Sequence, residues 1–244
     1  MKTDSENWRE LLRTNGYVVF PGLVPNSLTD AANEAVKLDL RENYNPARKI
    51  EYDNTSFCPE LRDKRVITDL LEKSPLWKIL DEAIGCENIE HDRGQIAIRE
   101  AHNVDKIHPP EPHIDGIPTP LNGVTGNKIT NFTALAGIFL TAQPGEFAGN
   151  FTVWPGSHHR LENYFRERGR QAQEEGMPQI ELGEPTQLVC STGDAVLCHY
   201  QLAHTAAVNT CDVNRIAVYF RIWLRGLENR RWHYLTNIWD GWKI

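Results

Sequence analysis

Arg215-Ile-Ala-Val-Tyr-Phe-Arg-Ile-Trp223 carries the clearest strand pattern in this chain. Its residues are mostly β-branched, aromatic or apolar, which is typical of strands. Because side chains alternate along a strand, Ile216, Val218, Phe220 and Ile222 are predicted on one face, and Arg215, Ala217, Tyr219 and Arg221 on the other. Two arginines on one face of an otherwise apolar strand need anionic partners if they point inward.

Similar short runs occur in the sequence from about residue 93 up to this strand. They alternate with turns rich in Gly, Pro and Asn, a pattern that favours a sandwich or barrel of antiparallel strands. One charged helical insert is expected at about 158–175. The other predicted strands are Gln95–Arg99, Asn131–Thr141, Phe151–Trp154, Gln187–Cys190 and Ala195–His199.

The N-terminal part has a different, mainly helical pattern. Helices are predicted at 4–14, 27–43 and 66–84, with a strand at Tyr17–Phe20 and irregular structure at 44–64. We expect these helices to cover one face of the sheet. The expected organisation is a single domain, mainly β with flanking helices, divided into a helical part (1–92), a β core (93–225) and a C-terminal extension (226–244).

Composition excludes several functional classes. The chain has 244 residues and a formal net charge of −7, which argues against a nucleic-acid partner. The longest largely apolar run, Phe132–Ala142, is too short to span a bilayer, and no secretory signal is visible. The 5 cysteines show no CxxC spacing and read as packing residues in a reducing compartment. We therefore expect a cytoplasmic protein without membrane partners.

One histidine cluster stands out chemically. His113 and Asp115 are two positions apart, so in an extended segment they point the same way. A third ligand, His204 on a neighbouring strand, would complete two imidazoles and one carboxylate around a single metal. That set is the facial triad of non-haem Fe(II) oxygenases. HxD by itself is a weak motif, and an ordinary loop histidine and aspartate remain the alternative.

The region after His204 adds support. Arg215 follows eleven positions later, and a guanidinium binds a carboxylate through two parallel hydrogen bonds. A dicarboxylate cosubstrate would provide such a partner. The alternative for Arg215 is a salt bridge to Asp194 or Asp212.

Three further strings carry a family resemblance. They are Gly149-Asn-Phe-Thr-Val-Trp-Pro-Gly-Ser-His158, Gly193-Asp-Ala-Val-Leu-Cys-His199 and Asn15-Gly-Tyr-Val-Val-Phe-Pro-Gly-Leu23. Together with His204, Asn209 and Arg215, they resemble the phytanoyl-CoA dioxygenase family over roughly residues 10–225. The resemblance implies a double-stranded β-helix (a cupin-like jelly roll) that uses Fe(II), 2-oxoglutarate and O₂.

The resemblance also implies residue roles. His113, Asp115 and His204 would be the iron ligands, and Arg215 would hold the distal carboxylate of 2-oxoglutarate. In keeping Asp115, the chain resembles the hydroxylating members of the family. The halogenating members lack this carboxylate. Two positions after the distal histidine the family often has a small hydroxyl residue. This chain has Ala206, so Thr205 or another group must serve, or the contact is absent.

Other side chains are candidates for contacts with the cosubstrate or the substrate. Thr133 and Gln95 are candidate cosubstrate contacts, against simple strand packing. Positive charge at Arg99, Arg221, Lys106 and Lys128 favours a small-molecule substrate with a carboxylate or phosphate group. Trp154 is expected in the core and is also a candidate substrate contact. The segments 44–64 and 102–130 are candidate walls of the substrate pocket. The aromatic residues of the C-terminal extension are expected to act as a plug or as a dimer contact.

The predicted activity is therefore oxidation of a small-molecule C–H bond with release of succinate and CO₂. Two alternatives stay open. A zinc-type hydrolase can use the same His/Asp/His set but has no need of Arg215. A non-catalytic binding or scaffold protein of the same fold usually loses a ligand, whereas all three are present here.

Overall fold

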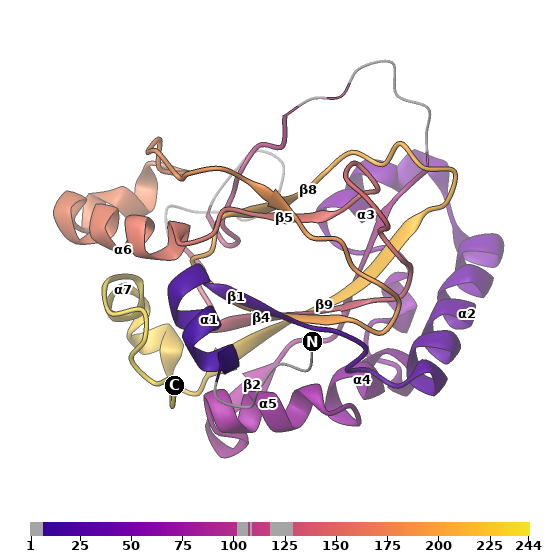
Figure 1. Cartoon of the computed structure of the whole chain (residues 1–244), viewed down its shortest axis with the longest axis horizontal. Coiled ribbons are helices and arrows are strands. Elements are labelled where there is room, and N and C mark those ends of the chain that lie inside the picture. Colours follow the sequence, from indigo (N-terminus) through magenta and orange to yellow (C-terminus); the bar gives the residue numbers. More distant parts are fainter. Residues whose placement is uncertain (1–6, 102–106, 108, 118–128) are drawn as a thin grey trace.

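The computed structural model describes residues 7–101, 107, 109–117 and 129–244. Its described part contains two antiparallel β-sheets that lie opposite each other (Figure 1). The smaller sheet has the order β6-β5-β8, formed by Thr186–Gln187, Phe151–Val153 and His204–Ala206. The larger sheet has the order β1-β7-β4-β9-β2, with β3 also paired to β9. Its strands are β1 (Tyr17–Phe20), β2 (Ile89–His91), β3 (Gln95–Arg99), β4 (Ala134–Phe139), β7 (Ala195–His199) and β9 (Arg215–Leu224).

Strand β9 is an interior strand of the larger sheet and pairs with β4 on one side and with β2 and β3 on the other. Its alternation is as the sequence predicts. Ile216, Val218 and Phe220 belong to the apolar cluster on the outer face, whereas Ala217 and Tyr219 belong to the cluster on the inner face, toward the smaller sheet. The two faces of this strand therefore belong to two different regions of the molecule.

Helices cover the outer face of the larger sheet, as expected (Figure 1). Their apolar residues share one core cluster with the outward-facing side chains of β3, β4, β7 and β9. The position of the helices leaves the inner face of the sheet to the functional residues. The helices are α1 (Asn7–Asn15), α2 (Asn26–Asn43), α3 (Lys49–Asn54), α4 (Arg65–Glu72) and α5 (Leu76–Ala83).

Two expectations for the helical part are wrong in detail. The helix predicted at 66–84 is two helices, because Pro75 has no N–H to donate and starts a new helix. Ser74 stabilises this start by accepting a hydrogen bond from the backbone N–H of Leu76. The segment 44–64, expected to be irregular, contains α3 and two short 3₁₀ turns, each with a proline at its first position.

Strand boundaries differ more modestly. The run predicted at 131–141 is a strand only at Ala134–Phe139, and the one at 187–190 is a strand only at Thr186–Gln187. Beyond each strand, Gln143 and Cys190 still pair as an isolated bridge. The cysteines are free thiols, as expected from their spacing. No helix in the described ranges is both long and apolar enough to cross a membrane.

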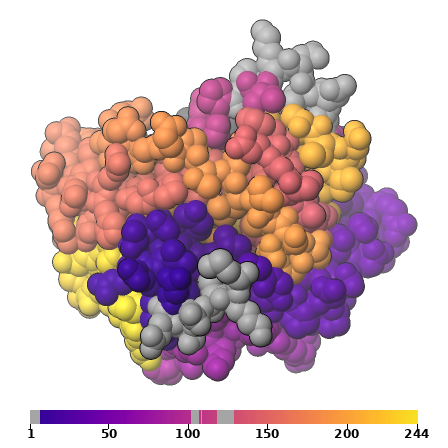
Figure 2. Space-filling model, viewed as in Figure 1, coloured from indigo at the N-terminus to yellow at the C-terminus, as the bar shows by residue number. Residues whose placement is uncertain are grey.

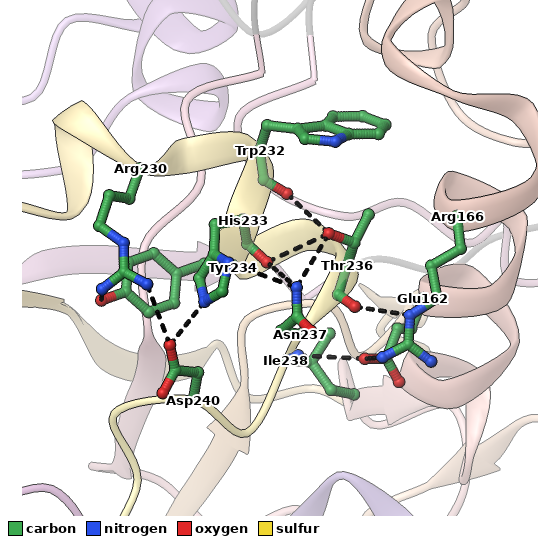
Figure 3. A network of polar contacts seen from close by, with 10 residues as sticks. All are labelled: Glu162, Arg166, Arg230, Trp232, His233, Tyr234, Thr236, Asn237, Ile238 and Asp240. Carbon is green, nitrogen blue, oxygen red and sulfur yellow. Dashed lines mark hydrogen bonds and ion pairs between the residues drawn. The ribbon is translucent and has the colours of Figure 1, made fainter.

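The C-terminal extension packs onto the charged helix α6 (Ser157–Arg168) through the short helix α7 (Arg231–Thr236). In Figure 3, Arg166 of α6 donates to the Glu162 carboxylate and to the Thr236 carbonyl, and the Ile238 N–H also donates to Glu162. In Figure 2 the C-terminal residues (yellow) lie beside the N-terminal helix (indigo). These contacts favour the packing role for the extension, with its tryptophans turned into the chain.

Candidate metal centre

Two histidines far apart in the sequence are joined directly through their backbones. The N–H of His113 donates to the carbonyl of His204 at 3.0 Å, and the N–H of His204 donates to the carbonyl of His113 at 2.9 Å. This isolated antiparallel bridge places the two imidazole rings 4.7 Å apart, centroid to centroid. The third ligand predicted from HxD, Asp115, lies two positions along the same extended segment and so on the same side.

The three side chains converge as the sequence predicts. The Oδ1 atom of Asp115 lies 3.7 Å from Nε2 of His113 and 3.8 Å from Nε2 of His204. All candidate ligand atoms lie within 4.8 Å of one another. Within the described residues, no other group of His, Cys, Asp and Glu side chains meets this criterion. Two imidazoles and one carboxylate on one side of a metal are the ligand set of non-haem iron oxygenases.

The protonation state of the site suits metal binding. Nδ1 of His204 lies 2.9 Å from the Leu202 carbonyl, which can only accept, so Nδ1 carries the proton and Nε2 presents its lone pair. Burial lowers the pKa of His204 to about 4, which keeps the ring neutral. Burial acts to raise the pKa of the Asp115 carboxyl, but Arg221 and the two imidazoles outweigh it and hold the pKa well below its usual range.

Arg221 and Tyr200 hold Asp115 in place. Nε and Nη2 of Arg221 donate to Oδ2 of Asp115 at 3.0 and 2.8 Å, which leaves Oδ1 toward the histidines. The Tyr200 hydroxyl donates to the backbone carbonyl of Asp115 at 2.9 Å. The next residue, Gly116, has φ +74°, and a Cβ there would lie 2.4 Å from the carbonyl oxygen of Thr130. Only glycine fits this turn without rearrangement.

The segment Trp154–Ser157 positions the strand that carries His204. The Ser157 hydroxyl accepts from the N–H of Ala203 at 2.9 Å, and the N–H of Trp154 donates to the Ala203 carbonyl at 3.0 Å. Both contacts hold the residue directly before His204. The Pro-Gly-Ser turn therefore orients a candidate ligand and has a structural role.

Arg215 is a buried cation on the inner face of the larger sheet, with 2 % of its surface exposed. Its Nε donates to the Gly149 carbonyl at 2.7 Å and its Nη1 to the Ala97 carbonyl at 3.2 Å. In the described part of the chain it has no carboxylate partner within ion-pair distance. A buried guanidinium without a counter-charge is costly, so this position favours an anionic ligand.

The alternative partners considered for Arg215 are otherwise engaged or exposed. Asp194 accepts from the N–H of Gly22 at 2.7 Å and from the N–H of Ser191 at 2.7 Å, so it joins the turn after β1 to the turn before β7. Asp212 is exposed on the segment that precedes β9. Neither acid pairs with Arg215 in the described structure.

The two candidate cosubstrate contacts have different surroundings. Gln95 lies opposite Tyr219 in the β3–β9 register and so on the same face as Arg215. Thr133 lies just before β4, and its hydroxyl oxygen accepts from the N–H of Leu224 at 3.0 Å. That bond joins the ends of two strands, and the contacts of both residues with a cosubstrate stay predictions.

The candidate substrate contacts are dispersed. Arg99 is on the inner face of β3, half-buried, with its Nη1 3.7 Å from Asp53 Oδ1. Arg221 is bound to Asp115, and Trp154 is buried in the inner core cluster. Lys106 lies outside the described residues, as do Lys128 and most of the proposed pocket wall at 102–130.

Sequence reasoning assigned no role to two residues that organise the site. Tyr200, which binds the Asp115 backbone, has no motif around it that indicates this contact. Asn209 is buried, and its amide donates to the carbonyls of Arg99 and Val213, both at 2.9 Å. This fixes the turn that leads into Arg215. The sequence indicated the importance of Asn209 only through its place among the residues that resemble the family.

Three other histidines, His158, His159 and His199, form a separate cluster. Nε2 of His158 and of His159 both lie within 3.0 Å of the Arg13 carbonyl, and Nε2 of His199 lies 2.8 Å from the Ile238 carbonyl. These rings pack against Trp239 and join the N-terminal helix to the C-terminal extension. They serve packing and do not take part in the triad.

The sheets, the triad and Arg215 together define the class of iron- and 2-oxoglutarate-dependent oxygenases, and comparisons with known proteins agree. The family model of phytanoyl-CoA dioxygenase matches residues 12–217. The chain therefore belongs to the phytanoyl-CoA dioxygenase family, as its motifs suggested. A search of curated proteins finds no match.

Solved structures share the fold at low sequence identity. The carbocyclase SnoK from nogalamycin biosynthesis, described as non-haem and α-ketoglutarate-dependent, superposes with a TM-score of 0.56 at 21 % identity, covering 90 % of this chain and 84 % of its own. HygX from Streptomyces hygroscopicus, with nickel, 2-oxoglutarate and hygromycin B bound, gives 0.59 at 14 % identity, covering 91 % and 88 %. The epimerase SnoN, solved with Fe³⁺, α-ketoglutarate and nogalamycin RO, gives 0.52 at 16 % identity, covering 89 % and 82 %.

Proposed function

We propose that this protein is a non-haem Fe(II)- and 2-oxoglutarate-dependent dioxygenase that oxidises a C–H bond of a small molecule, with release of succinate and CO₂. The observation that carries the proposal is the combination of the converged triad with the buried, uncompensated Arg215 on the same inner face. In this proposal residues 1–244 act as one domain, and the two sheets are the halves of a double-stranded β-helix.

The residues fit the cofactors. His113, Asp115 and His204 would hold the metal, since two nitrogen donors and one carboxylate suit ferrous iron. Arg215 would bind the distal carboxylate of 2-oxoglutarate, because its fixed fork of donors matches a carboxylate. When bound, iron and 2-oxoglutarate supply the oxidising power with O₂, and the protein contributes position and exclusion of side reactions.

The chain's own groups prepare the site. Arg221 keeps Oδ2 of Asp115 occupied, so Oδ1 remains for the metal. The Leu202 carbonyl selects the His204 tautomer whose Nε2 is free to bind. Both contacts favour a preformed site that does not have to reorganise on metal binding.

Hydroxylation is the outcome we favour, because Asp115 leaves no ligand position for a halide. The carbocyclase and epimerase among the similar structures illustrate that other oxidative outcomes occur on this fold. Small natural products are named with two of those structures, which supports a small-molecule substrate here. An anionic substrate group remains our prediction from Arg99, since Arg221 is engaged by Asp115.

A zinc-type hydrolase is the less favoured alternative, since it leaves the burial of Arg215 unexplained. A scaffold protein is also less favoured, since the triad is intact. The deciding experiment is anaerobic titration of the Fe(II)-loaded protein with 2-oxoglutarate, monitored by the weak visible charge-transfer band of the chelate. Admitting O₂ should then yield succinate.

The same titration is carried out on Arg215→Met. The control variant is Arg225→Met, because Arg225 is an exposed arginine just beyond the end of the same strand. We expect the band to be lost at moderate 2-oxoglutarate only in Arg215→Met. A wild-type protein that binds Fe(II) but gives neither band nor succinate contradicts the proposal.

A further inference from the structure

One polar group on the inner face has no partner and no assigned role. The hydroxyl oxygen of Tyr219 is buried, with no hydrogen-bond partner in the described structure, and the whole residue is 7 % exposed. Buried hydroxyls are nearly always satisfied, so a group like this calls for an explanation such as a missing ligand. The other buried side-chain atoms without a partner in the described structure belong to Asn33, Gln143, His158, Gln201 and Trp239, and none of these residues is on β9.

Tyr219 lies between the two functional ends of β9. Arg215 is four positions before it and Arg221, bound to Asp115, two positions after it, all on the inner face. The intervening residue on this face, Ala217, is paired with Ala97 in the β3–β9 register. Only the methyl groups of Ala97 and Ala217 therefore lie between Tyr219 and Arg215 on this face of the two strands. Tyr219 lies on the part of β9 between the triad end and Arg215.

The sheet is built to accept the Tyr219 ring. Its partner on β4 is Gly137, and a Cβ at that position would lie 2.7 Å from Cε1 of the ring. On its other side the ring contacts Phe151 at 5.4 Å between centroids, and Phe151 in turn contacts His204 at 5.3 Å. The ring is therefore held in the same layer as the triad.

The facing strand β8 places no hydroxyl group on the inner side that could contact the cosubstrate in place of Tyr219. Ala206 pairs with Phe151 and shares its inner side, but it carries only a methyl group. Thr205 pairs with Thr152 and, one position from His204 along the strand, points to the opposite face. The orientation of Thr205 therefore gives no support to it as a cosubstrate contact.

We propose that the Tyr219 hydroxyl donates a hydrogen bond to the distal carboxylate of 2-oxoglutarate, beside the Arg215 guanidinium. This inference rests on the proposed function and adds a second binding group to it. Tyr219 also has the protonation that a donor requires. Burial raises the pKa of Tyr219 to about 12, although the nearby Arg215 acts to lower it, so the phenol keeps its proton at neutral pH.

The test compares Tyr219→Phe with the wild type in the Fe(II)-loaded protein under anaerobic conditions. Binding of 2-oxoglutarate is measured by calorimetry and by the charge-transfer band, and so is binding of 2-oxobutyrate, which has the chelating end but no distal carboxylate. We expect Tyr219→Phe to weaken 2-oxoglutarate about 10- to 100-fold, the effect of one hydrogen bond to a charged acceptor, and to leave 2-oxobutyrate unchanged.

The melting temperature of the ligand-free protein is the second readout. Because the hydroxyl has no partner there, Tyr219→Phe should leave this temperature unchanged or raise it. A purely structural tyrosine would lower it. The matched control is Tyr52→Phe, which removes a phenol oxygen from a residue packed in the outer cluster and should change neither ligand's affinity.

The outcomes are separable. Equal 2-oxoglutarate affinity in wild type and Tyr219→Phe overturns the inference while leaving the proposed function intact. Parallel weakening of both 2-oxo acids also overturns it, because the hydroxyl then acts at the metal end or through packing. A wild-type protein that binds 2-oxobutyrate and 2-oxoglutarate equally, or neither, overturns the inference together with the role of Arg215.

Discussion

The two faces of β9 differ more than any two separate elements of this protein. The outer face, represented by Val218 and Phe220, is fully buried and apolar and packs beneath the helices. The inner face carries Arg215, Tyr219 and Arg221, and its buried polar atoms are incompletely satisfied by the protein.

This contrast indicates that one face of β9 mainly stabilises the fold, whereas the other face carries the candidate binding groups. Apolar burial on the outer face stabilises the fold by roughly 25 cal/mol for each Å² removed from water. Under the proposed function, the inner face gives up part of that stabilisation, because it holds the Arg215 cation and the Tyr219 hydroxyl for a ligand. Changes on the two faces should therefore separate function from stability.

The largest effect is expected from Asp115→Ala. Loss of a ligand should reduce succinate formation by more than the roughly 10- to 100-fold that loss of a supporting contact costs. Succinate assay with Fe(II), 2-oxoglutarate and a substrate measures it, and Asp212→Ala, an exposed acid, is the control. Retention of near wild-type turnover would exclude the triad as the reacting centre.

Arg215→Met should weaken 2-oxoglutarate binding about 30- to 1000-fold, corresponding to about 2–5 kcal/mol for one member of a buried charge pair. The ligand-free protein should be as stable as the wild type or more so, because a buried cation is replaced by an apolar side chain. Calorimetry and urea unfolding test the two parts. A large loss of stability with unchanged affinity would make Arg215 a structural residue.

Phe220→Ala is the opposite case on the outer face. Removing this fully buried ring should cost about 3–5 kcal/mol of unfolding free energy. The dissociation constant for 2-oxoglutarate should stay close to that of the wild type under conditions where the variant is folded. Urea unfolding and calorimetry measure both, and Ile50→Ala, at an exposed site, should be nearly neutral. Impaired binding in folded Phe220→Ala would show that the two faces are coupled.

The smallest effect concerns pH and the histidine cluster away from the triad. Burial lowers the pKa of His199 to about 4, and its Nδ1 accepts from the N–H of Gln201, so protonation would break that bond. The unfolded state, with a pKa near 6.5, takes up the proton first as pH falls. The contribution of neutral His199 is thus complete above about pH 6.5 and is lost toward pH 4.

The expected slope is up to about 1.4 kcal/mol of unfolding free energy per pH unit between those limits. Urea unfolding between pH 7 and 4.5 measures it, with His199→Gln as the comparison because carboxylates also titrate at the lower end. The variant should lose less stability than the wild type over this interval. Parallel pH curves would contradict the assignment.

Local patterns in the sequence were sufficient for much of the fold. Short β-like runs between turns predicted β3 and β7 with the bounds that the structure shows, and β9 to within one residue. Period-two alternation assigned Arg215 and Tyr219 to one face of β9. The helix at 66–84 was predicted as one element because its apolar spacing continues across Pro75, although the missing N–H ends it there.

The candidate site was predictable only as a set of residues. His113, Asp115 and His204 could be chosen from spacing and family motifs, but nothing local predicts that His113 and His204 exchange backbone hydrogen bonds. The pairing of Arg221 with Asp115 is likewise a contact between segments 106 residues apart. This pairing makes Arg221, a residue considered for substrate binding, a residue that orients a candidate metal ligand.

The amino-acid sequence by itself determined which side chains share a face, since alternation along a strand depends only on backbone geometry. It also specified the donor types available for a metal and a dicarboxylate. Tertiary structure alone decided which of these groups remain unsatisfied. Whether Asp194 neutralises Arg215, or whether any residue reaches the Tyr219 hydroxyl, depends on distances between distant segments, and those distances are set by how the sheets and helices pack.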